Sequence, residues 1–124
     1  MARVLLLLFL ACSATLFADE AVRARILVQV SPLAGFQYHD GKAVWEEMKV
    51  GDRLVLVREP DNPYDARAVR VEWNGRMIGY LPRVENAAVA RQLDHGNRLE
   101  ARITRLTRHR DPWKRVELEV FLPL

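Results

Sequence analysis

The sequence predicts an all-β protein, a small six-stranded barrel with two short helices. Six segments carry apolar residues in the alternating or continuous runs that are typical of strands. The connections between them are brief and rich in Pro, Gly, Asn and Asp, and only two segments have helical spacing. Such connections leave no room for the crossover helices of a parallel sheet, and closure into a barrel would remove the exposed sheet edges.

The first expected element is a strand over 21–31, which Pro32 ends. An aromatic segment follows, and residues 43–48 then have the spacing of one or two helical turns. Trp45 and Met48, three positions apart, are expected to pack in the core. One face of the strand would carry Ile26, Val28 and Val30.

The middle of the chain is expected to form three strands. Residues 54–57 are a continuous apolar run, which predicts a buried strand, and residues 68–73 alternate between apolar and polar. Asn74-Gly75 is a strong two-residue hairpin signal, so a strand over 77–80 should return beside the preceding one.

A second helix and two strands complete the predicted fold. Helical spacing over 84–93 places Ala88 against Val84. Residues 99–103 and 116–122 alternate as strands.

The composition is that of one ordinary globular domain of 124 residues. A net charge of +3 is too mild to indicate a nucleic-acid binder by itself. The basic residues are unusual in kind, with 16 Arg against 3 Lys. The planar guanidinium suits bidentate contacts to phosphate, although codon usage in a GC-rich genome also enriches arginine.

Residues 1–18 have the composition of a secretory signal-peptide helix. Arg3 supplies a positive charge, an apolar run follows, and cleavage is expected after Ala18, which leaves a domain over 19–124. The uncharged stretch spans roughly 22 Å as a helix at about 1.5 Å per residue, too short to cross a bilayer comfortably. We therefore expect an exported protein, periplasmic or secreted, with no membrane span after cleavage.

Two other locations stay open. Cys12, the only cysteine, could instead be lipidated, which would make the protein a lipoprotein. A misassigned start codon would make the protein cytoplasmic. After cleavage the chain would hold no thiol, so packing rather than disulfides or cysteine-bound zinc would stabilise it.

The loop over 58–71 is too specific in composition to be a simple connection. Two prolines fix the backbone, and Asp61, Asn62 and Asp65 can accept hydrogen bonds from nearby amides, which predicts a rigid loop. Tyr64 lies between a proline and a carboxylate. The loop is therefore either a ligand platform or a structural turn with a packed tyrosine and capping aspartates.

Several segments together resemble the HIRAN domain. They are the run from Leu56 to Asp65, then 68–71, then Gly79 to Arg83, and the Leu93-Asp94 helix end with Gly96; Gly35 to Gly41 is similar to the family's aromatic loop. The resemblance covers about residues 22 to 123, and the joint spacing is specific.

The resemblance implies an OB-like barrel that, in eukaryotic members, grips the 3′ end of single-stranded DNA beside helicase-type ATPases. Tyr38 and Tyr64 would then stack on bases, and Asp65 would accept from the terminal 3′-hydroxyl. Asn62 would shape the pocket. Tyr80 and Arg83 would line its wall and contact the sugar or phosphate, and Phe121 would close it.

Two positions depart from the family pattern. Gln37 stands where the DNA-binding members tend to have arginine, which removes a phosphate contact. Tyr80 replaces a histidine found in some of them. Both departures bear on affinity more than on fold.

The chain is expected to be a binding module rather than an enzyme, without cofactor or metal. Its histidines lack metal-ligand spacing, no serine or cysteine nucleophile is paired with a histidine and an acid, and no glycine-rich phosphate loop is present. Acidic residues near Pro60-Asp61 and Glu72 faintly resemble a restriction-type nuclease core, but the lysine that such a site needs is absent.

Three hypotheses on function follow. The first is a monomeric single-stranded nucleic-acid-binding module. The second is a periplasmic module that uses the same pocket for a peptide, a glycan or an envelope protein. The third is a cytoplasmic protein whose first 18 residues are an artefact.

Overall fold

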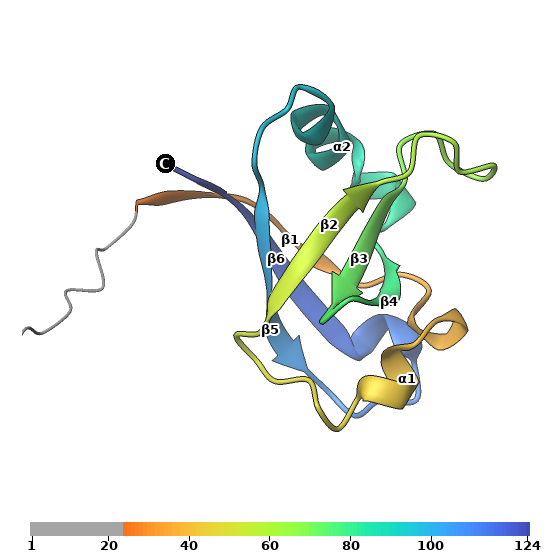
Figure 1. The fold of residues 1–124 in the computed structure, drawn as a ribbon. Coiled ribbons are helices and arrows are strands. Elements are labelled where there is room, and N and C mark those ends of the chain that lie inside the picture. Colours follow the sequence, from red (N-terminus) through yellow and green to blue (C-terminus); the bar gives the residue numbers. More distant parts are fainter. Residues whose placement is uncertain (1–23) are drawn as a thin grey trace, which may run out of the picture.

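The protein is described by a computed structural model of residues 24–124, and the predicted signal peptide lies outside these residues. Six strands form one antiparallel sheet in the order β1-β6-β5-β2-β3-β4 (Figure 1). The strands are β1 (Arg25–Pro32), β2 (Arg53–Arg58), β3 (Val69–Trp73), β4 (Arg76–Tyr80), β5 (Glu100–Leu106) and β6 (Val116–Pro123). The all-β class and the six strands are therefore as the sequence predicts.

The helical elements are short and lie between the strands. The two α-helices are α1 (Gly41–Val44) and α2 (Ala87–Asp94), and the three 3₁₀ turns are η1 (Phe36–Tyr38), η2 (Arg83–Glu85) and η3 (Pro112–Lys114). In Figure 1, α2 lies at one end of the strongly twisted sheet, while α1 lies at the opposite end.

The predicted closure into a barrel is wrong. Strands β1 and β4 are the two edges of the sheet, and they do not pair with each other. Near these edges the described chain forms one isolated bridge, in which Ala34 and Tyr80 exchange two backbone hydrogen bonds of 2.9 Å. Pro32 supplies no backbone donor, and η1 then turns the chain away, so the ladder cannot continue. The fold is an open, OB-like sheet.

The core is built from alternating residues of the central strands. Val69 and Val71 of β3 and Leu118 and Val120 of β6 are fully buried, as their alternation with polar residues predicts. Met48 is buried as expected, and other elements complete the core through Leu33, Phe36, Ile78, Leu81, Val89 and Ile103.

The hairpin signal is confirmed. Asn74 and Gly75 have φ angles of 47° and 77°, the positive values that a type I′ turn requires, and they join β3 to β4. Asn and Gly tolerate this left-handed backbone better than other residues.

Three local predictions need correction. Val84 is 95% exposed because α2 begins only at Ala87, so Val84 cannot pack against Ala88 in one helix. Ile26 and Val30 do not share a face, because an irregularity of β1 between Leu27 and Gln29 breaks the alternation and sets them opposite Leu122 and Glu119; both are about half exposed. Within the run over 54–57 Leu54 alone is fully buried, Val55 is exposed, and Leu56 and Val57 are partly buried.

Within residues 24–124, no helix has the length and hydropathy required to cross a bilayer. The same part of the chain brings no three His, Cys, Asp or Glu side chains together in an arrangement that could hold a metal ion.

Candidate functional site

A cleft of about 940 Å³ lies where the β2–β3 loop, the residues on either side of η1 with its last residue, Tyr38, and the end of β4 meet. It brings together six of the seven residues that the sequence singles out. These are Tyr38, Asn62, Tyr64, Asp65, Tyr80 and Arg83, and they share the cleft with Ala34, Gly35, His39, Arg58, Glu59, Pro60, Asp61, Pro63, Ala68 and Leu81.

Side chains of the β2–β3 loop hold its own backbone. Oδ1 of Asn62 accepts from the amides of Tyr64 and Asp65 at 2.9 and 3.2 Å, and Oδ1 of Asp65 accepts from the Arg67 amide at 2.9 Å. Such Asx turns replace the backbone partners that a loop lacks. The loop is therefore well braced, as its composition predicts.

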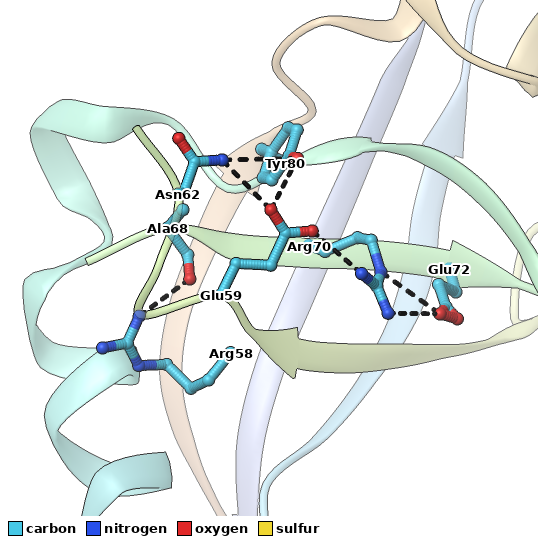
Figure 2. A network of polar contacts seen from close by, with 7 residues as sticks. All are labelled: Arg58, Glu59, Asn62, Ala68, Arg70, Glu72 and Tyr80. Atoms are coloured by element: carbon cyan, nitrogen blue, oxygen red, sulfur yellow. Dashed lines mark hydrogen bonds and ion pairs between the residues drawn. The ribbon is translucent and has the colours of Figure 1, made fainter. Parts of the chain in front are cut away.

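Arg58 ties the base of this loop to α2. Its guanidinium donates to the carbonyl oxygens of Ala66 and Ala68 at 3.0 and 2.9 Å, the second of which is drawn in Figure 2. It also donates to both carboxylate oxygens of Asp94, at 2.8 and 3.2 Å. The hydrogen bond from Arg58 holds the pKa of Asp94 below its ordinary value. One side chain thus fixes the loop against the end of the helix.

Tyr38 and Tyr64 are the two most exposed aromatic residues at the cleft, at 79% and 83% of their full surface. Neither packs into the core, and an 83% exposed Tyr64 is not packed over its loop, so that part of the structural-turn alternative is wrong, whereas Asp65 does cap the loop backbone. A large apolar ring is normally at least partly covered, and two such rings at one cleft offer faces for a flat ligand.

Asp65 lies half-buried in the lining of the same cleft. Its Oδ2 accepts from the side-chain amide of Asn86 at 2.7 Å. Burial alone would raise the pKa of Asp65, but the hydrogen bonds from Arg67 and Asn86 and the charge of Arg83 outweigh it and lower the pKa. Because its pKa is lowered, Asp65 is charged at neutral pH. A carboxylate offers about four acceptor sites, so Asp65 can still accept a hydrogen bond from a ligand.

Glu59 lies at the centre of a polar cluster on the cleft wall (Figure 2). Its Oε1 accepts from the Tyr80 hydroxyl at 2.8 Å and from the Asn62 amide at 3.0 Å, and its Oε2 pairs with Arg70 at 2.9 Å. Arg70 also pairs with Glu72 at 3.2 Å. Tyr80 and Asn62 are thereby oriented by a carboxylate that they share.

The cluster changes the ionisation of two of its members. Burial alone would raise the pKa of Glu59, but hydrogen bonds from Asn62, Tyr80 and Arg70 outweigh it, so the pKa is lowered. Burial and the hydrogen bond to Glu59 raise the pKa of the Tyr80 phenol. Glu59 is therefore a carboxylate and Tyr80 a neutral donor at pH 7.

Sequence reasoning did not assign Glu59 a role. The available signal is the alternation of Arg70 and Glu72 on one face of β3, with Tyr80 directly opposite Arg70 in the register. On this face Arg70 pairs with a second acid besides Glu72, and that acid is Glu59, the residue directly after β2.

Two predicted contributors lie differently from the rest. Arg83 is exposed at the cleft rim, close enough to lower the pKa of Asp65, and no described ion pair involves it. Phe121 does not line this cleft. Its ring is covered by the guanidinium groups of Arg25 and Arg102, at 4.6 and 4.9 Å from the ring centroid.

The cleft can therefore do three things chemically. It can stack flat rings on two tyrosines, accept a hydrogen bond at a charged Asp65, and attract one anionic group at Arg83. Of the two other acids in its lining, Glu59 is already engaged by three donors and Asp61 is exposed to solvent.

Comparison with known proteins identifies the family of this chain. The family model of the HIRAN domain matches residues 26–124. The helicase-like transcription factors of Oryctolagus cuniculus and Mus musculus are each 38% identical to this chain over 64 residues. That match covers 51% of this chain and 6% of each relative.

Two solved structures share the fold. A crystal structure of a protein from Lactobacillus plantarum superimposes with a TM-score of 0.70 at 29% identity, covering 81% of this chain and 96% of that one. The crystal structure of the HIRAN domain of human HLTF gives a TM-score of 0.58 at 20% identity, covering 80% of this chain and 77% of that one.

Proposed function

The chain belongs to the HIRAN domain family, a family of nucleic-acid-binding modules, and we propose that its cleft binds single-stranded DNA at a free 3′ end. The observation that carries this proposal is the placement of two exposed tyrosines and one charged carboxylate, Tyr38, Tyr64 and Asp65, at a single cleft. The chain acts as a binding module.

The tyrosines supply affinity without sequence preference. Every base has a flat face, and stacking on an aromatic side chain is worth about 1–3 kcal/mol per base. Neither ring has to leave the core to bind, so little reorganisation of the protein opposes stacking.

Asp65 supplies the preference for an end. A terminal 3′-hydroxyl donates a hydrogen bond to the carboxylate, whereas a phosphate at the same place brings a second negative charge against it. The lowered pKa of Asp65 keeps the acceptor charged at neutral pH. Arg83 lies at the rim, where it attracts a neighbouring phosphate.

Fluorescence anisotropy with two labelled oligonucleotides tests the proposal. They share one sequence and carry a free or a phosphorylated 3′ end. The free end should bind more tightly, and both affinities should weaken as salt rises. Equal and negligible affinity for the two would contradict the proposal and favour a peptide or glycan from the cell envelope as the ligand.

Variants of the tyrosines separate binding from folding. Tyr38→Ala and Tyr64→Ala should each cost about 1–3 kcal/mol in binding while the free energy of unfolding stays nearly unchanged, because both rings are exposed. Val55→Ala is the matched control, since Val55 is exposed and lies outside the cleft lining. Asp65→Ala is a poorer test, because Asp65 also holds the loop backbone.

The location of the protein is a separate proposal, supported by the composition of residues 1–18. Export with cleavage after Ala18 predicts a native protein whose intact mass corresponds to a chain that begins at Asp19. A native mass that includes the leader would contradict cleavage.

A further inference from the structure

The cleft itself offers little positive charge to a polyanion. Its lining holds three carboxylates, Glu59, Asp61 and Asp65, against the guanidinium groups of Arg58 and Arg83. Arg58 is already paired with Asp94. Arg83 is thus the single lining arginine without an ion pair among the described residues, while a nucleic-acid strand brings about one negative charge per nucleotide.

A basic surface lies on the other side of η1. We name it the basic depression: a hollow of about 550 Å³ whose lining includes Gln37, Lys42, Arg108 and Arg115. Glu46 is the one acid in that lining, and it pairs with Arg108. The described ion pairs do not involve Lys42, so the basic depression keeps a net positive charge.

The cleft and the basic depression are neighbours, separated by a single turn. Tyr38 of η1 lines the cleft, and the two preceding residues, Phe36 and Gln37, line the basic depression. In Figure 1, η1 lies beside α1 and the connection from β5 to β6, which includes η3. A strand that stacks on Tyr38 therefore passes over η1 when it leaves the cleft on this side.

The β5–β6 connection is held in place before any ligand arrives. Arg115 donates to the carbonyl oxygens of His109 and Arg110 at 2.8 and 3.4 Å, and its guanidinium lies 5.5 Å from the Phe36 ring centroid. Asp111 caps η3 through the Trp113 amide at 3.0 Å. A preformed basic surface loses little conformational entropy on binding.

We propose that the basic depression binds the phosphates of the strand whose 3′ end occupies the cleft, an inference that rests on the proposed function. Lys42 and Arg108 supply exposed positive charges, because the Arg108–Glu46 pair is 71% and 76% exposed and such an exposed pair is weak, whereas Arg115 supplies a charge held by backbone carbonyls. The strand runs from Tyr38 across Gln37 into the depression. Its position beside Gln37 lets this surface contribute the positively charged phosphate contact that a neutral glutamine does not supply.

Oligonucleotides of two lengths, each with a free 3′-hydroxyl, test this path. The short oligonucleotide, of about 3 nucleotides, fills the cleft alone. The long one, of about 12 nucleotides, also reaches the basic depression, and its length lies within the about 4–16 nucleotides that one OB fold binds. The double variant Lys42→Ser/Arg108→Ser should bind the short one like the unmodified protein. For the long one, the slope of log K against log salt should fall by about 1.4, since each phosphate contact to a single strand contributes about 0.7.

The matched control is Arg53→Ser/Arg98→Ser. It makes the same change in charge, and both arginines lie near Glu100 at the start of β5, whereas the basic depression adjoins the connection after the end of β5. All four residues are exposed, so both double variants should remain folded, which thermal unfolding checks.

Each outcome decides one proposal. An unchanged slope and affinity of Lys42→Ser/Arg108→Ser for the long oligonucleotide would overturn the phosphate path, even where the free 3′ end is still preferred. A reduced slope without any 3′-end preference would support the path and contradict end recognition. Absence of binding at both lengths contradicts both.

Discussion

The side-chain amide of Asn86 donates to Oδ2 of Asp65 at 2.7 Å, across 21 positions of sequence. Asn86 precedes α2 and is fully buried, whereas Asp65 lies at the cleft. Oδ1 of Asn86 is also buried and has no hydrogen-bond partner among the described residues. The orientation of the proposed 3′-hydroxyl acceptor thus depends on a residue that does not line the cleft.

Replacement of Asn86 with alanine should loosen Asp65. The expected loss in the free energy of unfolding is about 1.5 kcal/mol, at the low end for a hydrogen bond to a charged group, because the variant also removes the unpartnered Oδ1. Preference for a free over a phosphorylated 3′ end should fall as well. Urea unfolding and anisotropy measure the two effects. Asn97→Ala, at an exposed asparagine, is the control, and an unchanged 3′-end preference in Asn86→Ala would contradict this role.

Replacement of Glu59 with glutamine should disturb the polar cluster. Glutamine cannot accept from Arg70 on one side and from Tyr80 and Asn62 on the other, so one donor loses its partner. We expect a loss of about 1–3 kcal/mol in the free energy of unfolding. Glu47→Gln is the control, because Glu47 is exposed and takes part in no described ion pair. Equal stability of the two variants would show that the cluster contributes nothing.

Stability should fall in acid. The pKa values of Glu59 and Asp65 in the folded protein lie below their ordinary values of 4.5 and 3.8. Their contribution to stability is therefore complete above those ordinary values and is lost as the pH falls through the lowered ones. The free energy of unfolding should decrease between about pH 5 and pH 3, and the decrease should be shallower in Glu59→Gln. Urea titrations at several pH values would reveal it, and identical pH profiles would refute the assignment to Glu59.

Gly79 should not tolerate a side chain. A Cβ atom there would lie 2.4 Å from the carbonyl oxygen of Ala34 and 2.9 Å from Leu33 Cγ. Gly79→Ala should therefore break the bridge between Ala34 and Tyr80 and destabilise the fold by about 1–3 kcal/mol or more. Gly75→Ala meets no atom within 4 Å and carries only the strain of its positive φ, about 1–2 kcal/mol. Thermal unfolding should rank Gly79→Ala as the less stable, and the reverse order would contradict the clash.

Local signals predicted most of the fold. Alternation placed β3 and β6 correctly, and Asn74-Gly75 fixed a hairpin, because each depends on neighbouring residues alone. Barrel closure depends on whether two distant edges meet, and no local pattern encodes the turn of η1 after Pro32 that prevents it. The start of α2 was misplaced because the 3₁₀ turn η2 has a similar local spacing.

Six of the seven predicted site residues line one cleft, but Tyr38, Tyr80 and Arg83 were reached only through the family resemblance. Asn62, Tyr64 and Asp65 share one loop, so their presence in one cleft lining follows from its rigid composition. Contacts between distant segments were not accessible in the same way. Asn86 and Glu59 each have at least one partner more than ten positions away, and Phe121 is held by arginines on other strands.

Because the sheet is open, we expect a ligand bound in the cleft to link its two edges. The walls of the cleft come from the chain after β1 and from the β2–β4 side, and within the described residues one bridge between Ala34 and Tyr80 joins those two edges. A strand stacked on both tyrosines spans the same gap, so occupancy should slow deuterium exchange at the amides of Ala34 and Tyr80 and raise the melting temperature with ligand concentration. Binding of a DNA end would then also stabilise the contact between the two edges of the sheet.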